Sequence, residues 1–134
     1  MRTLALIFLC GSLAAGVAKA GAPAFRVTIE APAAKVGAAA QARVKVTAGD
    51  GYHVNKDYPT SLKLTAPSGV DLPKATVTRG NGVTIEEKQA LFEIAYTAKE
   101  PGKKTFTGEM KFAVCTDTTC DPKKEKVTFT VDVK

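Results

Sequence analysis

The chain has 134 residues, of which 24% are charged, with a net charge of +6. This length is enough for one domain with a buried core. The positive surplus is small and scattered among acidic residues, and no arginine-rich stripe with interleaved aromatic residues occurs, which argues against nucleic-acid binding.

The first twenty residues, MRTLALIFLCGSLAAGVAKA, have the pattern of a secretory signal peptide. A basic start precedes an apolar run from Leu4 to Val17, and a small-x-small ending predicts cleavage after Ala20. The apolar run is too short to span a bilayer comfortably. Bulky Leu9 precedes Cys10 where a lipid-attachment motif usually has a small residue, which favours simple cleavage over a lipoprotein.

Cleavage would leave residues 21–134 as a single domain, with a net charge reduced by two, from +6 to +4, by the loss of Arg2 and Lys19. No other segment has the length and apolar character of a membrane span, so we expect a periplasmic protein. The mature chain would keep two cysteines, Cys115 and Cys120, and an even pair in an exported protein is normally a disulfide.

The mature sequence predicts strands rather than helices. Two prolines and Gly37 divide the alanine-rich start into pieces too short for a stable helix, and a first strand is predicted at Phe25–Glu30. Five further runs alternate apolar and polar residues with the period of a half-buried strand. They are QARVKVT (41–47), SLKLTAP (61–67), ALFEIAYTA (90–98), TFTGEMKFAV (105–114) and KVTFTVDVK (126–134).

Turn sequences separate these runs: AGDG, APSG, RGNG, EPGKK and CDPKK. Roughly seven or eight short strands with no convincing helix predict an all-β domain, an immunoglobulin-like antiparallel β-sandwich.

Alternation also predicts where the cysteines lie. Val114 continues a buried face, so Cys115 should lie on the opposite face at the end of its strand. Four polar residues lead to Cys120, and Asp121-Pro122 would mark the turn into the last strand. A disulfide here would close the tip of a hairpin, near solvent.

Two kinds of chemistry fit the pair poorly. Zinc usually takes four ligands, and His53 is the chain's one histidine, so no metal is expected. Copper could use a methionine, but Met110 should face the core. A hydrolytic Cys/His site needs a reduced thiol, which a second cysteine nearby would tend to oxidise.

A structural staple and a redox pair remain open from the spacing alone. Closing a six-residue ring contributes roughly 2 kcal/mol, less than a bond between distant strands would. An accessible disulfide in a short polar loop exchanges readily. Three nearby lysines, Lys123, Lys124 and Lys126, would lower a thiol pKa, whereas Asp117 and Asp121 would raise it.

The hairpin FAVCTDTTCDPKKEKVTFTV resembles the cysteine hairpin of the amino-terminal periplasmic domain of DsbD, the membrane thiol:disulfide interchange protein. In that family too, two cysteines flank a short polar loop between strands. The stretch GDGYHVNKDYPTSLKL is similar to a second family segment, in which a Gly-aromatic turn precedes a proline and an "xLxL" strand. The resemblance covers nearly all of the mature chain.

The resemblance implies an immunoglobulin-like fold, no cofactor, and electron relay between proteins. Cys115 and Cys120 would be the redox pair, with Cys120 forming the mixed disulfide with a partner and Cys115 resolving it. Tyr52, His53 and Asn55 match the segment that lines the family's site. The implied partners are thioredoxin-fold periplasmic proteins and a membrane thiol transporter acting in trans, which would make the chain a protein-disulfide reductase module.

The sequence departs from the family at three places. His53 and Asn55 stand where well-known members have tyrosines. The segment that best matches the family's cap loop, Arg79–Gln89, has no aromatic residue; its glycines suit a mobile gate, although an ordinary hairpin loop is the simpler interpretation. The alternative to relay is therefore a non-catalytic binding or assembly module with a structural hairpin disulfide.

Overall fold

The computed structural model describes residues 23–134, so the expected signal peptide, residues 1–20, lies outside the described residues. Within that range the chain forms ten strands and no helix, which confirms the all-β prediction. The strands are β1 (Phe25–Glu30), β2 (Ala39–Ala48), β3 (His53–Val54), β4 (Ser61–Thr65), β5 (Val70–Asp71), β6 (Thr76–Arg79), β7 (Gly82–Ile85), β8 (Gln89–Ala98), β9 (Gly102–Cys115) and β10 (Cys120–Val133). No helix that could cross a membrane occurs in residues 23–134.

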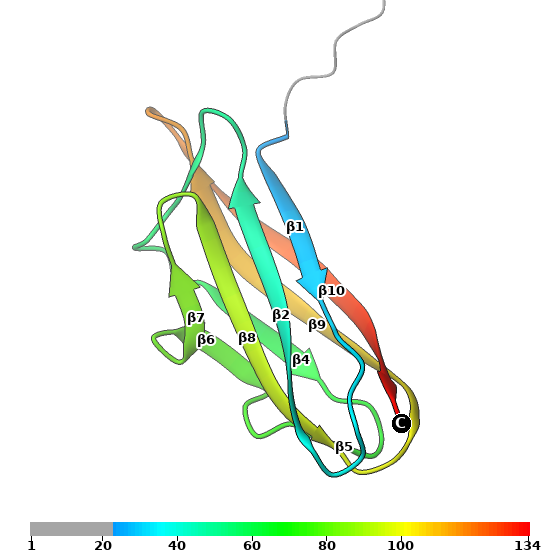
Figure 1. Ribbon diagram of the computed structural model, residues 1–134. Coiled ribbons are helices and arrows are strands. Elements are labelled where there is room, and N and C mark those ends of the chain that lie inside the picture. The colour runs from blue at the N-terminus through cyan, green and yellow to red at the C-terminus, as the bar shows by residue number, and fades with distance from the viewer. Residues whose placement is uncertain (1–22) are drawn as a thin grey trace, which may run out of the picture.

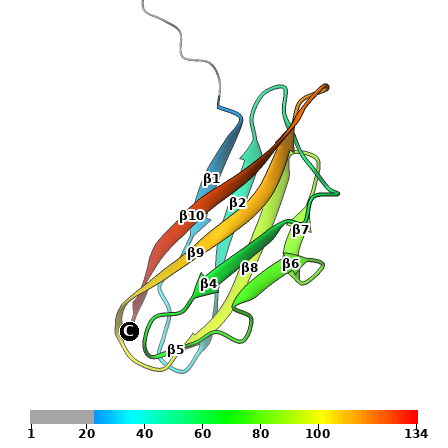
Figure 2. The ribbon, with the colours of Figure 1, turned by 180° about the vertical axis from the view of Figure 1, so that it is seen from behind.

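The strands form an immunoglobulin-like sandwich of two layers (Figures 1 and 2). Hydrogen bonds connect them in the order β1-β2-β8-β7-β6-β4-β9-β10, and β3 and β5 pair with β9 and β8. Strands β1, β2 and β8 lie in one layer and β4, β9 and β10 in the other. The β6–β7 pair is parallel, whereas the other strand pairs are antiparallel.

The core lies between the layers because alternate side chains of each long strand point inward. The apolar residues that the alternation predicted to face inward on β8, β9 and β10 are buried, with partly buried Gly108 the exception. Phe106 is at the centre of an aromatic cluster, with ring centroids 5.1 Å from Tyr96 and 4.8 Å from Phe129. Phe25 of β1 packs against Phe112 of β9, with ring centroids 5.0 Å apart, and this contact connects the two layers.

The start of β10 differs from the sequence prediction. Asp121 and Pro122 lie within the strand, where Pro122 is paired in register with Ala113, and the turn comes earlier, at residues 116–119. Proline lacks the N–H that a central strand needs, but β10 is at one end of the strand order, where that loss is tolerated.

Gly108 allows β4 and β9 to approach closely. A Cβ atom at this position would lie 2.4 Å from the Lys63 carbonyl oxygen and 2.7 Å from Leu64 Cδ2. We therefore expect Gly108→Ala to lower the free energy of unfolding by about 1–3 kcal/mol, the usual cost of overpacking. Urea denaturation measures this, with exposed Thr107→Ala as the control. Equal midpoints for Gly108→Ala and wild type would contradict the close packing.

The Tyr96 hydroxyl is buried and has no hydrogen-bond partner among the described residues. We expect Tyr96→Phe to stabilise the protein by about 1 kcal/mol, because it removes an unsatisfied polar group.

Burial also raises the pKa of Tyr96 above its ordinary value. The unfolded chain then loses this proton first, so wild-type stability falls as pH rises past about 10, and Tyr96→Phe should lack that part of the fall. Denaturation at neutral and alkaline pH tests both effects, and a less stable Tyr96→Phe would contradict them.

Candidate functional site

The cysteine pair lies at one end of the sandwich, at the tip of the β9–β10 hairpin (Figures 1 and 2). Cys115 is the last residue of β9 and Cys120 the first of β10, and the two are paired across the ladder. They form a disulfide with an S–S distance of 2.05 Å and a Cα–Cα distance of 4.0 Å. The antiparallel register therefore places the two sulfurs together without any contribution from the loop.

The two cysteines differ in exposure. Cys115 is only 2% exposed, whereas Cys120 is exposed. Cys115 lies outside the continuous core that Val114 joins and is nevertheless buried, at a position where β9 pairs with both β3 and β10. The prediction of a disulfide near solvent is thus right for Cys120 and wrong for Cys115. An incoming group can reach the pair through Cys120.

The loop between the cysteines is closed by Thr116. Its backbone N–H donates to the Thr119 carbonyl at 2.7 Å, and its hydroxyl accepts from the Thr119 N–H at 3.1 Å. The two threonine hydroxyls are 3.0 Å apart. Hydroxyl groups thus satisfy the backbone of a turn that has neither glycine nor proline.

Strand β3 brings a second segment to the cysteines. His53 is paired with Cys115, and the Asn55 N–H donates to the Ala113 carbonyl at 2.9 Å. An open hollow beside the disulfide is lined by His53, Val54, Asn55, Lys56, Asp57, Glu87, Cys115 and Cys120. Of the three residues expected to line a site, His53 and Asn55 border this hollow. Tyr52 does not, and instead packs half-buried against the core.

The Asn55 side chain contacts the exposed sulfur. Its Nδ2 lies 3.7 Å from Cys120 Sγ, and its Oδ1 accepts a hydrogen bond from the Asp57 N–H at 2.9 Å. The second bond is an Asx turn in the sequence Asn55-Lys56-Asp57, which holds the amide in place. A hydrogen-bond donor is therefore directed at Cys120.

Two of the lysines near the cysteines are held in ion pairs. Lys123 Nζ lies 2.5 Å from Asp121, and Lys124 Nζ lies 3.6 Å from Glu109. The side-chain hydrogen bond with Asp121 holds the pKa of Lys123 above its ordinary value. Neither lysine lines the hollow beside the disulfide.

The segment expected as a cap or hairpin loop consists of strand β7 and the turns on either side of it. Residues 79–89 contain β7, and the turn that follows is closed by a 2.8 Å bond from the Glu86 N–H to the Gln89 carbonyl. Backbone bonds of 2.8 Å from Val54 to Glu87 and from Ala48 to Lys88 attach this turn to the segment around β3. The backbone hydrogen bonds agree with an ordinary hairpin connection between β7 and β8, and the interpretation as a mobile gate stays a prediction.

Sequence reasoning missed Glu87, Lys56 and Asp57 at the hollow. The Asn-x-Asp turn signal marks Asp57, whereas Glu87 is brought in by the β7–β8 turn and its backbone bond to Val54. Within residues 23–134, no cluster of three or more His, Cys, Asp or Glu side chains is placed to hold a metal ion.

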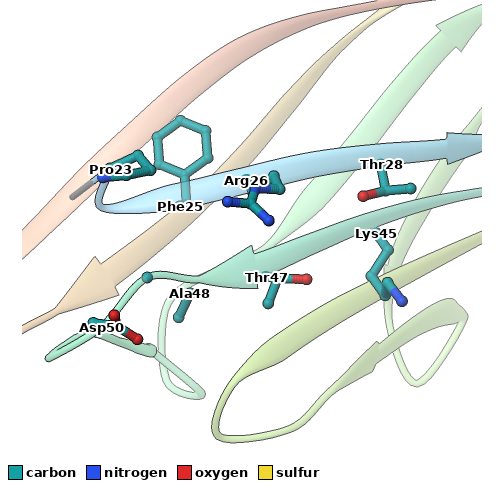
Figure 3. A pocket seen from close by; sticks show the side chains of 9 residues that line it. Pro23, Phe25, Arg26, Thr28, Lys45, Thr47, Ala48 and Asp50 are labelled. Carbon is teal, nitrogen blue, oxygen red and sulfur yellow. The ribbon is translucent and has the colours of Figure 1, made fainter.

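A second hollow runs along β1 and β2 (Figure 3). Arg26, Thr28, Lys45 and Thr47 line it as outward-facing strand residues, and it shares no residue with the hollow beside the disulfide. No cysteine is among the residues that line it.

Fold and site together define an immunoglobulin-like β-sandwich with an asymmetric disulfide at one end. Among solved structures it is similar to AggA, the major subunit of aggregative adherence fimbriae type I from Escherichia coli, at 16% identity and a TM-score of 0.43, covering 87% of this chain and 98% of that one. It is also similar to a PapD-like domain of human CEP192, at 11% identity and a TM-score of 0.38, with 95% of each chain covered. No curated protein sequence matches the chain.

The family model for the N-terminal part of the thiol:disulfide interchange protein DsbD matches residues 21–132. The chain therefore belongs to the family of DsbD N-terminal domains, which confirms the resemblance seen in the two quoted segments. This family is named for thiol:disulfide interchange, and the chain has a disulfide in the hairpin that carried the resemblance.

Proposed function

We propose that this chain is a periplasmic thiol–disulfide exchange module that passes electrons through Cys115 and Cys120 to or from thioredoxin-fold partners. The observation that carries the proposal is the asymmetry of the disulfide, with Cys120 exposed and Cys115 2% exposed, in a member of the DsbD N-terminal family. Export through the signal peptide at residues 1–20 would place it in a compartment where such exchange occurs.

When the module reduces a partner, the Cys120 thiolate attacks one sulfur of the partner's disulfide. A bond forms between Cys120 and that sulfur, and the partner's other sulfur leaves as a thiolate. Cys115, after losing its proton, then attacks Cys120 Sγ, which re-forms the internal disulfide and releases the partner's second thiolate. The module gives up two electrons and the partner gains two.

The pairing of β9 with β10 supports the attack of Cys115 on Cys120, because the two residues face each other with a Cα–Cα distance of 4.0 Å. Burial of Cys115 keeps a partner from competing for that sulfur. No cofactor takes part, since both electron pairs move between sulfur atoms. A membrane thiol transporter acting in trans would supply the electrons.

Disulfide transfer to a thioredoxin-fold protein tests the proposal. The module is reduced with dithiothreitol, freed of reductant, and mixed with an oxidised thioredoxin, and thiols are followed by alkylation and gel shift. We expect two thiols to appear on the partner as two disappear from the module. Transfer no faster than between the partner and glutathione at equal thiol concentration would contradict the proposal.

A binding module with a structural clip is the second candidate, favoured by the hydrogen-bonded turn at Thr116 and Thr119. The two candidates differ in what Cys115→Ser/Cys120→Ser does. A clip predicts a loss of about 2 kcal/mol in unfolding free energy, from a six-residue ring, with partner binding kept. An exchange module predicts that the double variant transfers no electrons, whatever the change in stability. The thiol assay measures electron transfer, and co-purification with a partner measures binding, so together they distinguish the two candidates.

A further inference from the structure

We propose that Asn55 is a positioning residue that makes Cys120 the reactive thiolate, by directing its side-chain N–H at Cys120 Sγ. This inference rests on the proposed function for its biological use. It adds a residue that sets which of the two sulfurs reacts, and it concerns a property of the reduced protein that is measurable without any partner.

The orientation of the amide follows from its neighbours. The Asp57 N–H can only donate, and it lies 2.9 Å from one end of the Asn55 side chain, so that end must be the carbonyl oxygen Oδ1. The NH₂ end, Nδ2, then faces Cys120 Sγ at 3.7 Å. The Asn55 backbone is itself anchored to the Ala113 carbonyl of β9 at 2.9 Å. Both ends of the residue are therefore fixed relative to the hairpin.

The contact should strengthen when the disulfide is reduced. A disulfide sulfur is a weak acceptor, whereas a thiolate carries a full negative charge, and hydrogen bonds to ionised groups are about twice as strong as neutral ones. A donor that favours the charged form lowers the pKa of a thiol. The donor contacts Cys120 only, while burial of Cys115 disfavours a charge there. Both effects assign the thiolate to Cys120.

Titratable groups around Cys120 come from several elements, and the acidic side chains outnumber the basic ones. His53 of β3, Lys56 and Asp57 of the following loop, and Glu87 of the β7–β8 turn line the hollow. Asp117 lies in the β9–β10 turn, and Asp121 and Lys123 of β10 pair with each other.

These charges are screened by salt, whereas a direct hydrogen bond from a neutral amide is not. High salt should therefore reduce the influence of Lys56, Asp57 and Glu87 on Cys120 and leave that of Asn55. The salt dependence distinguishes the two kinds of influence.

The experiment uses Cys115→Ser, in which Cys120 is the one thiol of the mature chain. The thiolate absorbance at 240 nm is titrated against pH, at low salt and in about 1 M salt, alone and with Asn55→Ala or Asn55→Asp. We expect Asn55→Ala to raise the pKa of Cys120 by about one unit at both salt concentrations. At a pH below both pKa values, alkylation by iodoacetamide should then slow by roughly five- to tenfold.

Asn55→Asp keeps an oxygen that can accept from the Asp57 N–H, so the turn is retained while the N–H donor is replaced by a carboxylate. At low salt we expect a larger rise in the pKa of Cys120 than in Asn55→Ala. Asn81→Ala, at an asparagine on the β6–β7 turn, is the matched control and should leave the pKa unchanged. The inference would be overturned if Asn55→Ala left the pKa of Cys120 unchanged. It would also be overturned if the pKa shift in Asn55→Ala disappeared in high salt.

These outcomes are separable from the proposed function. A response of the Cys120 pKa to Asn55 in a protein that transfers no electrons would keep this inference and remove the exchange role. Rapid electron transfer in a protein whose Cys120 pKa does not change in Asn55→Ala would keep the exchange role. The choice of the reacting sulfur would then follow from accessibility alone.

Discussion

Cys120→Ser is expected to abolish disulfide exchange with a thioredoxin-fold partner, and Cys115→Ser to leave a mixed disulfide that does not resolve. The reason is the difference in access: Cys120 is exposed at the start of β10, whereas Cys115 is 2% exposed between β3 and β10. Without Cys120 the partner finds no accessible sulfur. Without Cys115 the first bond forms, but the module has no second thiolate to complete the transfer, so only the reverse attack by the partner's freed thiolate can break it.

Non-reducing gel electrophoresis after mixing with an oxidised partner measures both effects. The Cys115→Ser reaction should accumulate a band of the summed mass that dithiothreitol removes, and Cys120→Ser should give none. Thr118→Ser, an exposed change in the same turn, is the control and should exchange like wild type. A trapped adduct with Cys120→Ser, or wild-type transfer by either cysteine variant, would contradict the assigned order of attack.

Phe106→Ala is expected to lower the free energy of unfolding by about 3–5 kcal/mol, the range for deleting a buried aromatic side chain. Phe106 is fully buried, stacks on Phe129 at a centroid distance of 4.8 Å, and meets the edge of Tyr96 at 5.1 Å. It contacts residues from β8 and β10, so its loss leaves a cavity between the two layers. This is a large part of the stability of a domain of this size.

Chemical denaturation followed by circular dichroism measures the loss. Val36→Ala is the control, because Val36 is a large apolar residue that is 44% exposed, and its change should stay within about 0.5 kcal/mol. A cost for Phe106→Ala near that of the control would contradict the arrangement of the aromatic cluster.

Alternation along the chain predicted the long strands well, because each of them buries one face. The first strand has the predicted bounds, Phe25–Glu30, and the inward faces of β8, β9 and β10 follow the predicted parity. The short strands β3, β5, β6 and β7 were not predicted, since two to four residues are too few to show a period. Pro122 was assigned to a turn because an edge strand cannot be distinguished from a central one before the strand order is known.

At the candidate site, the sequence identified the cysteines but not their difference in exposure. Parity placed Cys115 off the core face, and alternation alone could not show that this residue is buried where β3, a strand of two residues, pairs with the end of β9. Glu87, more than 30 residues from β3 in the sequence, reaches the hollow through the β7–β8 turn and its backbone bond to Val54. The Asn55 contact with Cys120 spans 65 residues, so no local pattern reports it.

The reduction potential of the Cys115–Cys120 pair tests the central claim most directly. Equilibration of the mature protein in glutathione or dithiothreitol buffers, with thiols quantified by alkylation, gives this potential. An exchange module predicts a value between about −200 and −270 mV, within the range of known exchange proteins. A value well below about −300 mV, typical of structural disulfides, would contradict the claim and make the pair a clip at the end of the sandwich.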